Sequence, residues 1–457
     1  MGGIAELLHN LGYAISGSDA RDSAMTQRLR GLGIDVSIGH DAGRVTGCEL
    51  VVVSTAIGGD NAELAAARKQ KTPIVPRAQM LAELMRLKYS IAVAGTHGKT
   101  TTTSLVANLL AEGDLDPTFV IGGRLNSIGA NARLGEGEYL VAEADESDAS
   151  FLLMQPLIAV VTNIDADHME TYEGDYSRLR HAFLEFLHHV PFYGHAVLCL
   201  DDPTIREMLP EVAKPVVTYG IDSNADWRAE QIRHEGIQSH FLAVHRDTQT
   251  SLDVTLNLPG RHNVLNALAA VAVAHELGVN EQSIGRGLAG FQGIGRRFQC
   301  FGELATPSGP VTLVDDYAHH PREIAATVQA ARDSWPNRRL TAVFQPHRYT
   351  RTRDLFDDFA QVLSDIDALV LLDVYPAGEA PISGADSRSL SRAIRARGRV
   401  DPVFVEDTGE LTSVLEGVLK PGDVLLTLGA GDIGSVPAVL CEAWPLKSAA
   451  AGGGGGR

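Results

Sequence analysis

The segment from Ile91 to Ser104, Ile-Ala-Val-Ala-Gly-Thr-His-Gly-Lys-Thr-Thr-Thr-Thr-Ser, carries the strongest chemical signal in the sequence. An apolar, β-prone run leads into a turn with two glycines and a lysine, and a helical pattern follows. Backbone N–H groups of such a turn, together with the positive end of the helix, bind phosphate. The Lys99 ammonium adds a charge for the β- and γ-phosphates, and the Thr100 hydroxyl suits Mg²⁺. We therefore predict a phosphate loop. Val93 stands where the usual motif has a glycine, so a turn that contains Gly-Lys-Thr by chance is the alternative.

An acidic segment, Val141-Ala-Glu-Ala-Asp-Glu-Ser-Asp148, ends a second apolar strand. Ligands of open parallel sheets bind outside the carboxyl ends of the strands. Four carboxylates at such an end, beside a phosphate loop, predict Mg²⁺ binding, and a solvated acidic loop is the alternative. A third strand, Val160 to Thr162, also runs into polar residues that could hold a second metal ion or orient a nucleotide. These residues are Asn163, Asp165, Asp167 and His168.

Two asparagines, Asn263 and Asn266, lie one turn apart at the start of a predicted helix. Both amides can therefore face one ligand. Capping of the helix by one asparagine is the alternative, but it does not account for both.

Two more polar segments follow apolar strands in the last third of the chain. Asp315-Asp-Tyr-Ala-His-His-Pro321 is the first, and Phe344-Gln-Pro-His-Arg-Tyr-Thr-Arg-Thr-Arg353 is the second. The second segment gathers His347, Arg348, Arg351 and Arg353 into a basic patch that suits a carboxylate or a phosphate. An ordinary basic surface loop is the alternative.

The segment Gly429-Ala-Gly-Asp-Ile-Gly434 matches a dinucleotide-binding fingerprint, but 23 residues remain after it, too few for the second strand with its ribose-binding acid. We interpret it as a tight turn before a helix, which argues against a nicotinamide cofactor.

Composition excludes several classes of function. The 457-residue chain has 57 acidic residues against 39 Lys and Arg, a net charge of −18, which argues against nucleic acid and anionic membranes as partners. The four cysteines have no metal-binding spacing, so we expect free, mostly buried thiols in a reducing cytosol. No apolar run has the length of a membrane span or a signal peptide, and we expect a cytoplasmic protein.

Strand–helix alternation predicts an α/β protein with three domains and mostly parallel sheets. We place the domains at 1–88, 89–295 and 296–447, followed by a disordered tail at 448–457. Strands are expected at 14–16, 50–54, 119–121, 139–143, 157–162, 196–200, 311–314, 340–344, 368–373, 403–405 and 424–428, and helices at 4–11, 62–70, 79–87 and 264–277. Residues 227–258 show a hairpin-like alternation.

Taken in order, these segments resemble the Mur ligase family. Gly95-Thr-His-Gly-Lys-Thr-Thr, Glu143-Ala-Asp-Glu-Ser-Asp, Thr162-Asn-Ile-Asp-Ala-Asp-His-Met, Gly260-Arg-His-Asn-Val-Leu-Asn, Arg296-Arg-Phe, Asp315-Asp-Tyr-Ala-His-His-Pro and Gln345-Pro-His-Arg-Tyr-Thr-Arg carry the resemblance over nearly the whole chain. It implies a Rossmann-like UDP-binding domain, a central P-loop ATPase domain and a C-terminal Rossmann-like domain that admits an amino acid. Ser147-Asp-Ala-Ser-Phe151 and the lack of lysine from Glu170 to Val212 are typical of the branch that joins L-alanine to UDP-N-acetylmuramate.

The resemblance also implies roles for residues. Lys99 contacts the ATP phosphates, Thr100 and Glu143 hold one Mg²⁺, His168 holds a second, and His347, Arg348 and Arg351 lie near the incoming alanine. The implied ATP-binding residues are Gly95, Thr96, His97, Gly98, Lys99, Thr100, Thr101, Asn263, Asn266, Arg297 and Asp316, with both asparagines facing adenine. The implied UDP-sugar contacts are Ser16, Ser18, Asp19, Ser54 and Arg77.

Members of the family begin with a strand and a glycine-rich loop that receive the UDP diphosphate, whereas this chain starts after that point, at Met1-Gly-Gly-Ile. We therefore expect an underpacked first helix (Ile4, Leu7, Leu8, Leu11) and weak UDP-sugar binding by this chain. The implied reaction is ATP-dependent amide ligation through an acyl phosphate, in peptidoglycan precursor synthesis, by a monomer or homodimer.

Overall fold

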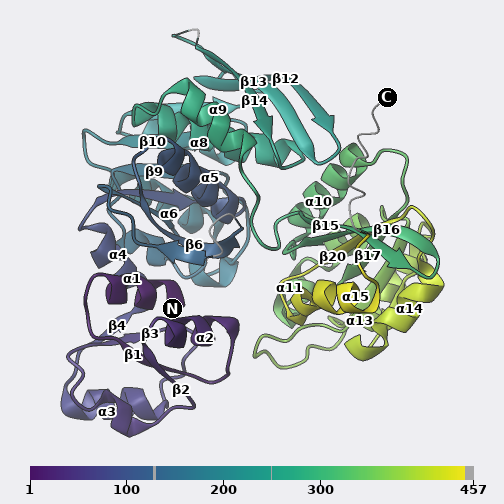
Figure 1. The fold of residues 1–457 in the computed structure, drawn as a ribbon, viewed down its shortest axis with the longest axis horizontal. Coiled ribbons are helices and arrows are strands. Elements are labelled where there is room, and N and C mark those ends of the chain that lie inside the picture. The colour runs from purple at the N-terminus through teal and green to yellow at the C-terminus, as the bar shows by residue number, and fades with distance from the viewer. Residues whose placement is uncertain (127–129, 249, 448–457) are drawn as a thin grey trace, which may run out of the picture. The chain divides into compact units, whose positions relative to one another are not determined.

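The computed structural model describes residues 1–126, 130–248 and 250–447, so the predicted tail at 448–457 lies outside the described residues. By its internal contacts the chain divides into two compact units (Figure 1). The first comprises residues 1–232, 241–255 and 263–292, and the second comprises residues 233–240, 256–262 and the chain from Gly293 onward. The domain boundaries placed from the sequence stay predictions.

The first 85 residues alternate short helices and strands. The helices are α1 (Gly2–Asn10), α2 (Ala24–Gly31), α3 (Ala62–Gln70) and α4 (Arg77–Met85), and the strands are β1 (Ser16–Asp19), β2 (Asp35–Ile38), β3 (Val51–Val53) and β4 (Ile74–Pro76). Strand β1 pairs in parallel with β2, and β3 with β4, as two separate two-stranded sheets. Strand β1 has the polar sequence Ser-Gly-Ser-Asp, because parallel pairing uses backbone groups and does not require apolar side chains. The sequence predicted this strand at 14–16, so the predicted position was too close to the N-terminus.

Helix α1 is packed better than the sequence suggested. Ile4 and Leu7 are each 2% exposed, because α1 contacts α2 and two strands of the central sheet, β6 and β7. Gly3 permits this approach, since a Cβ there would lie 2.9 Å from the Ala132 Cβ on β7. The expectation of an underpacked apolar face was therefore wrong for Ile4 and Leu7, although Leu11 is 41% exposed.

A ten-stranded sheet forms the centre of the first unit, in the order β14-β13-β12-β11-β10-β9-β5-β8-β6-β7. Its strands are β5 (Tyr89–Ala94), β6 (Thr118–Leu125), β7 (Ala130–Arg133), β8 (Tyr139–Glu143), β9 (Ile158–Val161), β10 (His195–Cys199), β11 (Val216–Gly220), β12 (Trp227–Glu235), β13 (Gln238–His245) and β14 (Ser251–Leu256). The helices are α5 (Lys99–Glu112), α6 (Tyr176–His188), α7 (Pro203–Met208), α8 (Arg261–Glu276) and α9 (Glu281–Ala289). The hairpin-like region predicted at 227–258 consists of three consecutive strands that are neighbours in the sheet (Figure 1).

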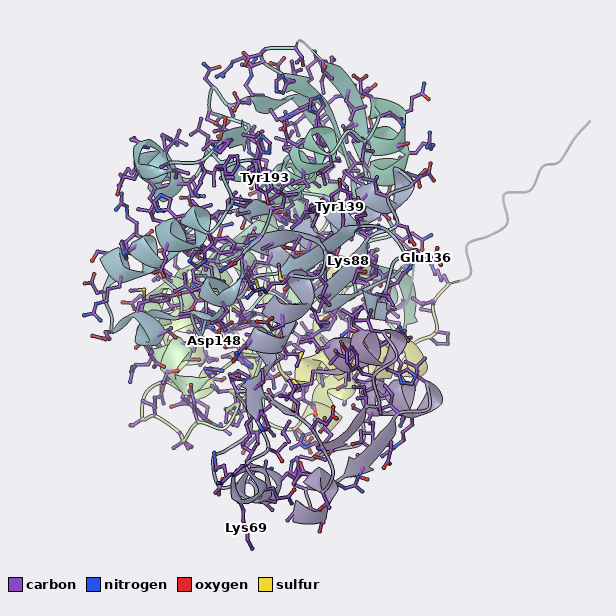
Figure 2. The ribbon with its side chains drawn as sticks, turned by 90° about the vertical axis from the view of Figure 1, so that its left-hand side faces the viewer. Lys69, Lys88, Glu136, Tyr139, Asp148 and Tyr193 are labelled. Carbon is purple, nitrogen blue, oxygen red and sulfur yellow. The ribbon has the colours of Figure 1, made fainter. Side chains whose placement is uncertain are left out.

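Strand β5 lies between β8 and β9 and is parallel to both. The carboxyl ends of these three strands carry the phosphate loop, the acidic segment and the Asn163–His168 segment, so the sheet brings the three predicted motifs to one edge. At the other end of β5, the Lys88 ammonium donates to the carbonyls of Gly135 (2.9 Å) and Gly137 (2.6 Å), which fastens the start of the strand (Figure 2).

The second unit contains a six-stranded sheet in the order β15-β16-β20-β17-β18-β19. Its strands are β15 (Gln299–Thr306), β16 (Gly309–Asp316), β17 (Leu340–Phe344), β18 (Ala368–Leu372), β19 (Val403–Val405) and β20 (Val424–Leu428), and its helices are α10 (Pro321–Ser334), α11 (Tyr349–Asp354), α12 (Phe356–Leu363), α13 (Ser387–Ala396), α14 (Leu411–Val418) and α15 (Val436–Ala443). One core packs α10, α12 and α13 on the sheet, and a second packs α14 and α15. Only β15 is antiparallel among the pairings within this sheet, so the predicted parallel α/β architecture is confirmed.

Candidate active site

The loop between β5 and α5 has the geometry of a phosphate loop. Gly95 and Gly98 adopt positive φ angles of 128° and 85°, where a side chain is strained. A Cβ at Gly95 would lie 2.1 Å from the Thr162 Oγ1, and one at Gly98 would lie 2.6 Å from the Asn266 Oδ1. Both glycines are therefore required by conformation and by space, which the alternative of a chance Gly-Lys-Thr does not explain.

Hydrogen bonds from residues that follow β9, a neighbour of β5 in the sheet, fix this loop. The Asn163 side chain accepts from the His97 N–H (2.8 Å) and donates to the His97 carbonyl (2.9 Å). The Thr96 hydroxyl accepts from the Asp165 N–H at 2.9 Å, and His97 Nε2 lies 3.4 Å from the Asp165 carboxylate. Asn163 and Asp165 therefore shape the phosphate loop, a role that the sequence did not specify.

Lys99 is half-buried, with 17% of its side chain exposed, and its ammonium has a carboxylate partner. Nζ lies 2.7 Å from Glu146 Oε2 and donates to the carbonyls of Gly95 (2.6 Å) and Thr96 (3.2 Å). Burial opposes its charge, but the carboxylates of Glu146, Asp145 and Glu143 raise the pKa of Lys99. This ion pair was not predicted from the sequence, although Glu146 lies within the predicted acidic segment.

The acidic segment separates into residues with different environments. Glu146 is 1% exposed, and burial raises its pKa to about 7 against the opposing charge of Lys99. Although burial alone would raise it, the pKa of Asp145 is lowered by Lys99, by hydrogen bonds from Ser147 and by His168. Asp148 is exposed (Figure 2), so only part of the segment faces the loop.

Two of the three residues predicted to bind metal, Glu143 and His168, lie at or beyond the carboxyl ends of β8 and β9. Glu143 is the last residue of β8, and its Oε1 accepts from the Gly122 N–H at 2.6 Å. His168 has a positive φ of 54°, which is rare for a residue with a side chain, and its Nε2 lies 3.6 Å from the Asp167 carboxylate. Because the charge of His168 lowers the pKa of Asp145, these two side chains lie within electrostatic reach of each other.

Asn263 and Asn266 are both buried on α8 and contact each other. Asn266 Nδ2 donates to Asn263 Oδ1 (3.2 Å), and its Oδ1 accepts from the Thr102 hydroxyl at 3.2 Å on α5. Helix α8 begins at Arg261, so neither asparagine is the residue that precedes the helix and the capping alternative fails. The structure thus places both amides beside the phosphate loop and its helix.

The predicted UDP-sugar contacts are distributed over two small sheets. Ser16, Ser18 and Asp19 lie on β1, where the Ser18 hydroxyl contacts His40 (2.9 Å) and Glu63 (2.7 Å). Ser54 follows β3, and Arg77 begins α4. The charges of Asp19 and Arg77 both act on the Met1 amino group. Burial and the charge of Arg77 lower the pKa of this amino group, whereas the charge of Asp19 raises it.

In the second unit, the basic segment follows β17. His347 lies between two rings, with Tyr375 stacked at 5.5 Å and His319 edge-on at 5.7 Å. Burial and the charges of His319, Arg351 and Arg348 lower the pKa of His347 to about 4. The imidazole is therefore neutral at pH 7, within electrostatic reach of the permanently charged guanidiniums of Arg351 and Arg348.

Arg297 and Asp316 lie near the beginning of the same unit. Both carboxylate oxygens of Asp316 accept backbone N–H groups, from Phe298 (2.7 Å) and Ala318 (2.8 Å). Burial raises the pKa of Asp316 to about 6, against the charge of Arg297, whose guanidinium lies over the Tyr317 ring at 5.1 Å. The contacts of Asp316 show that it holds the local turn.

The fold and these motifs define a class of protein: the chain belongs to the Mur ligase family, which comprises ATP-dependent amide-forming ligases. The Mur ligase family catalytic domain matches residues 1–89, the Mur ligase middle domain matches residues 93–274, and the Mur ligase glutamate ligase domain matches residues 296–431. The three-domain architecture predicted from the sequence is therefore confirmed.

Within the Mur ligase family, the chain is most informatively compared with three individual proteins. The chain is 62% identical over 442 residues, 97% of this chain and 93% of the relative, to UDP-N-acetylmuramate–L-alanine ligase of Methylococcus capsulatus. The crystal structure of UDP-N-acetylmuramate-alanine ligase from Thermotoga maritima is similar with a TM-score of 0.81 and 30% identity over 97% of both chains. A murein peptide ligase from Psychrobacter arcticus is similar with a TM-score of 0.71 and 25% identity, over 97% of this chain and 96% of that one.

The remaining predictions on the whole chain have mixed outcomes. All four cysteines are free, but only Cys199 is buried. Among the described residues, no helix combines the length and apolar character needed to span a membrane.

Proposed function

We propose that this chain joins L-alanine to UDP-N-acetylmuramate, with ATP converted to ADP and phosphate. The observation that carries the proposal is the phosphate loop, whose lysine is paired with the buried Glu146, together with 62% identity to a relative that bears the name of this activity. In the proposed reaction the substrate carboxylate attacks the γ-phosphorus to give an acyl phosphate. The amine of alanine then displaces phosphate and forms the amide.

Residues of the first unit are assigned to phosphoryl transfer. Lys99 and the N–H groups around Gly95 and Gly98 hold and neutralise the phosphates, and Asn263 and Asn266 face the adenine. Neutralisation of this kind stabilises the charge that develops on the γ-phosphate as it moves. Ser16, Ser18, Asp19, Ser54 and Arg77 are assigned to the UDP-sugar.

The residues at the start of α5 and at the end of β8 fit Mg²⁺. A buried hydroxyl at Thr100, the Glu143 carboxylate and the low-pKa carboxylate of Asp145 are the oxygen donors that this ion prefers. We assign Thr100 and Glu143 to one ion and His168 to a second. Bound Mg²⁺ would screen the phosphate charges against the approaching carboxylate.

Residues of the second unit are assigned to the amino acid. The guanidiniums of Arg348 and Arg351 suit its carboxylate, because arginine binds carboxylates with two parallel hydrogen bonds. The His347 imidazole is neutral at pH 7, so it keeps one unprotonated ring nitrogen that can accept a hydrogen bond from the incoming amine.

Steady-state ADP release tests the proposal. ADP should form only when UDP-N-acetylmuramate and an amine are both present, and L-alanine should be the preferred amine. Preference for the tripeptide L-alanyl-γ-D-glutamyl-diaminopimelate would favour the murein peptide ligase activity instead. Tight ATP binding with no ADP release under any combination would indicate a nucleotide-binding protein without ligase activity.

A further inference from the structure

The loop that carries His347 is held by the backbone of Tyr375. The Tyr375 N–H donates to the Pro346 carbonyl (2.9 Å), and the Arg348 N–H donates to the Tyr375 carbonyl (2.8 Å). The two hydrogen bonds continue the parallel pairing of β17 and β18 beyond the ends of both strands, as a bridge between His347 and Tyr375. Tyr375 is therefore fixed opposite His347 by main-chain contacts.

The side chains of the two residues are also in face-to-face contact. Their ring centroids are 5.5 Å apart with an angle of 9° between the planes, and the His319 ring meets His347 at 72° from another direction. The Nδ1 atom of His347 is buried and makes no hydrogen bond within the part of the chain that the structure describes. Functional histidines are commonly oriented by a hydrogen bond at one ring nitrogen. Here ring contacts take the place of that bond at Nδ1.

The glycine-rich segment after β20 explains how Tyr375 can occupy this position. A Cβ on Gly431 would lie 2.6 Å from Tyr375 Cγ and 2.5 Å from Gln345 Oε1, so a side chain there would collide with both. The Gln345 amide is fixed in turn, because it donates to Asp432 at 2.6 Å and accepts from the Ile433 N–H at 3.1 Å. The motif that resembles a dinucleotide fingerprint thus makes room for the residues that support the His347 loop.

We propose that Tyr375 is a positioning residue of the amino-acid site, whose ring face sets the orientation of the His347 imidazole toward the incoming amine. This inference rests on the proposed function, because it takes His347 to face the amino acid. The ring of Tyr375 carries the effect, and its hydroxyl is not needed for it. A flat, rigid face sets the plane of the imidazole in a way that a flexible aliphatic side chain cannot.

Three substitutions test the proposal in the full chain, by initial rates with L-alanine, ATP and UDP-N-acetylmuramate varied in turn. Tyr375→Leu keeps most of the buried volume without an aromatic face, Tyr375→Ala removes both, and Tyr375→Phe keeps the face without the hydroxyl. We expect Tyr375→Leu and Tyr375→Ala to raise the KM for L-alanine by about tenfold or more, since misplacement of a reacting group by a fraction of an ångström has effects of this size. The KM for ATP should stay within about twofold of the wild type, and Tyr375→Phe should restore the wild-type KM for L-alanine.

The outcomes separate the positioning role from general loss of structure. An unchanged KM for L-alanine in folded Tyr375→Leu, or failure of Tyr375→Phe to restore it, would overturn the proposal, as would an equal rise in the KM for ATP. If Tyr375→Ala fails to fold, the comparison of Tyr375→Leu with Tyr375→Phe decides alone. Wild-type protein that does not ligate L-alanine would instead overturn the proposed function. Tyr193→Ala is the matched control, because Tyr193 is 63% exposed and belongs to the first unit.

Discussion

The Nζ atom of Lys99 lies 2.7 Å from Oε2 of Glu146, so the lysine of the phosphate loop is held by a buried carboxylate. The other Glu146 oxygen, Oε1, is buried without a hydrogen-bond partner in the described part of the chain. Removing one member of such a pair leaves the other buried and uncompensated, which is costly. The pair therefore links the stability of the loop to the group that contacts phosphate.

Substitution of the lysine should separate these two roles. Lys99→Ala should lower the ligation rate by about 10²–10³, the usual effect of losing one electrostatic contact to a transition state. It should also lower the melting temperature, because Glu146 loses its partner. The double variant Lys99→Ala/Glu146→Gln should recover the melting temperature but not the rate. Near-normal turnover in folded Lys99→Ala would contradict the assignment of the phosphate loop.

The stability of the protein should depend on pH through Glu146. Its folded-state pKa is about 7, above the ordinary value of 4.5 that applies in the unfolded chain. The folded state therefore keeps a proton that the unfolded state releases between these pH values, and the free energy of unfolding falls as pH rises through this window. Urea unfolding of the wild type and Glu146→Gln between pH 4.5 and 8 measures this contribution. The free energy of unfolding of the wild type, minus that of Glu146→Gln, should fall as pH rises to about 7 and then level off. A difference that stays constant over this range would show that Glu146 does not titrate there.

Metal binding can be tested at the ends of the strands. Glu143→Gln and His168→Ala should each raise the Mg²⁺ concentration that gives half-maximal rate, because each removes a ligand. Asp148→Asn is the matched control, since Asp148 belongs to the same acidic segment but is exposed. Unchanged Mg²⁺ midpoints for both ligand variants would exclude them as ligands.

Two glycines with similar backbone angles test the shape of the loop. Gly98 and Gly278 have φ angles of 85° and 76°, but only Gly98 has a neighbour, Asn266, within the space of a Cβ. Alanine at either position should cost about 1 kcal/mol of stability for the left-handed backbone. Gly98→Ala should in addition lower ATP affinity at least about tenfold, while Gly278→Ala binds ATP normally. Equal ATP affinities by calorimetry would contradict the tight packing of the loop against Asn266.

The regular core of the fold could be predicted from the sequence, and its polar parts could not. The strands Tyr139–Glu143, Leu340–Phe344, Val403–Val405 and Val424–Leu428 match their predicted bounds. Their continuous apolar runs are typical of strands covered on both faces. Strand β1 was misplaced because a short polar strand has no such pattern. The antiparallel strand β15 (Gln299–Thr306), with its polar and glycine residues, was missed for the same reason.

The candidate site could likewise be predicted from the sequence only in part. The order of strands β9-β5-β8 brings together the three motifs that were expected to meet. The pairing of Lys99 with Glu146 and the stacking of Tyr375 on His347 depend on loop conformations, which spacing along the sequence does not specify. Positive φ angles at His168 and Arg348, neither of them glycine, are examples of such conformations.

The central claim is that one oxygen of the sugar carboxylate attacks ATP and leaves with the phosphate. UDP-N-acetylmuramate labelled with ¹⁸O in its carboxylate, incubated with the wild-type chain, ATP, Mg²⁺ and L-alanine, tests this directly by mass spectrometry of the products. An acyl phosphate intermediate should place one ¹⁸O atom in the released phosphate for each amide formed and leave one ¹⁸O in the amide carbonyl. Amide formation with unlabelled phosphate, or ADP release without any amide product, would contradict it.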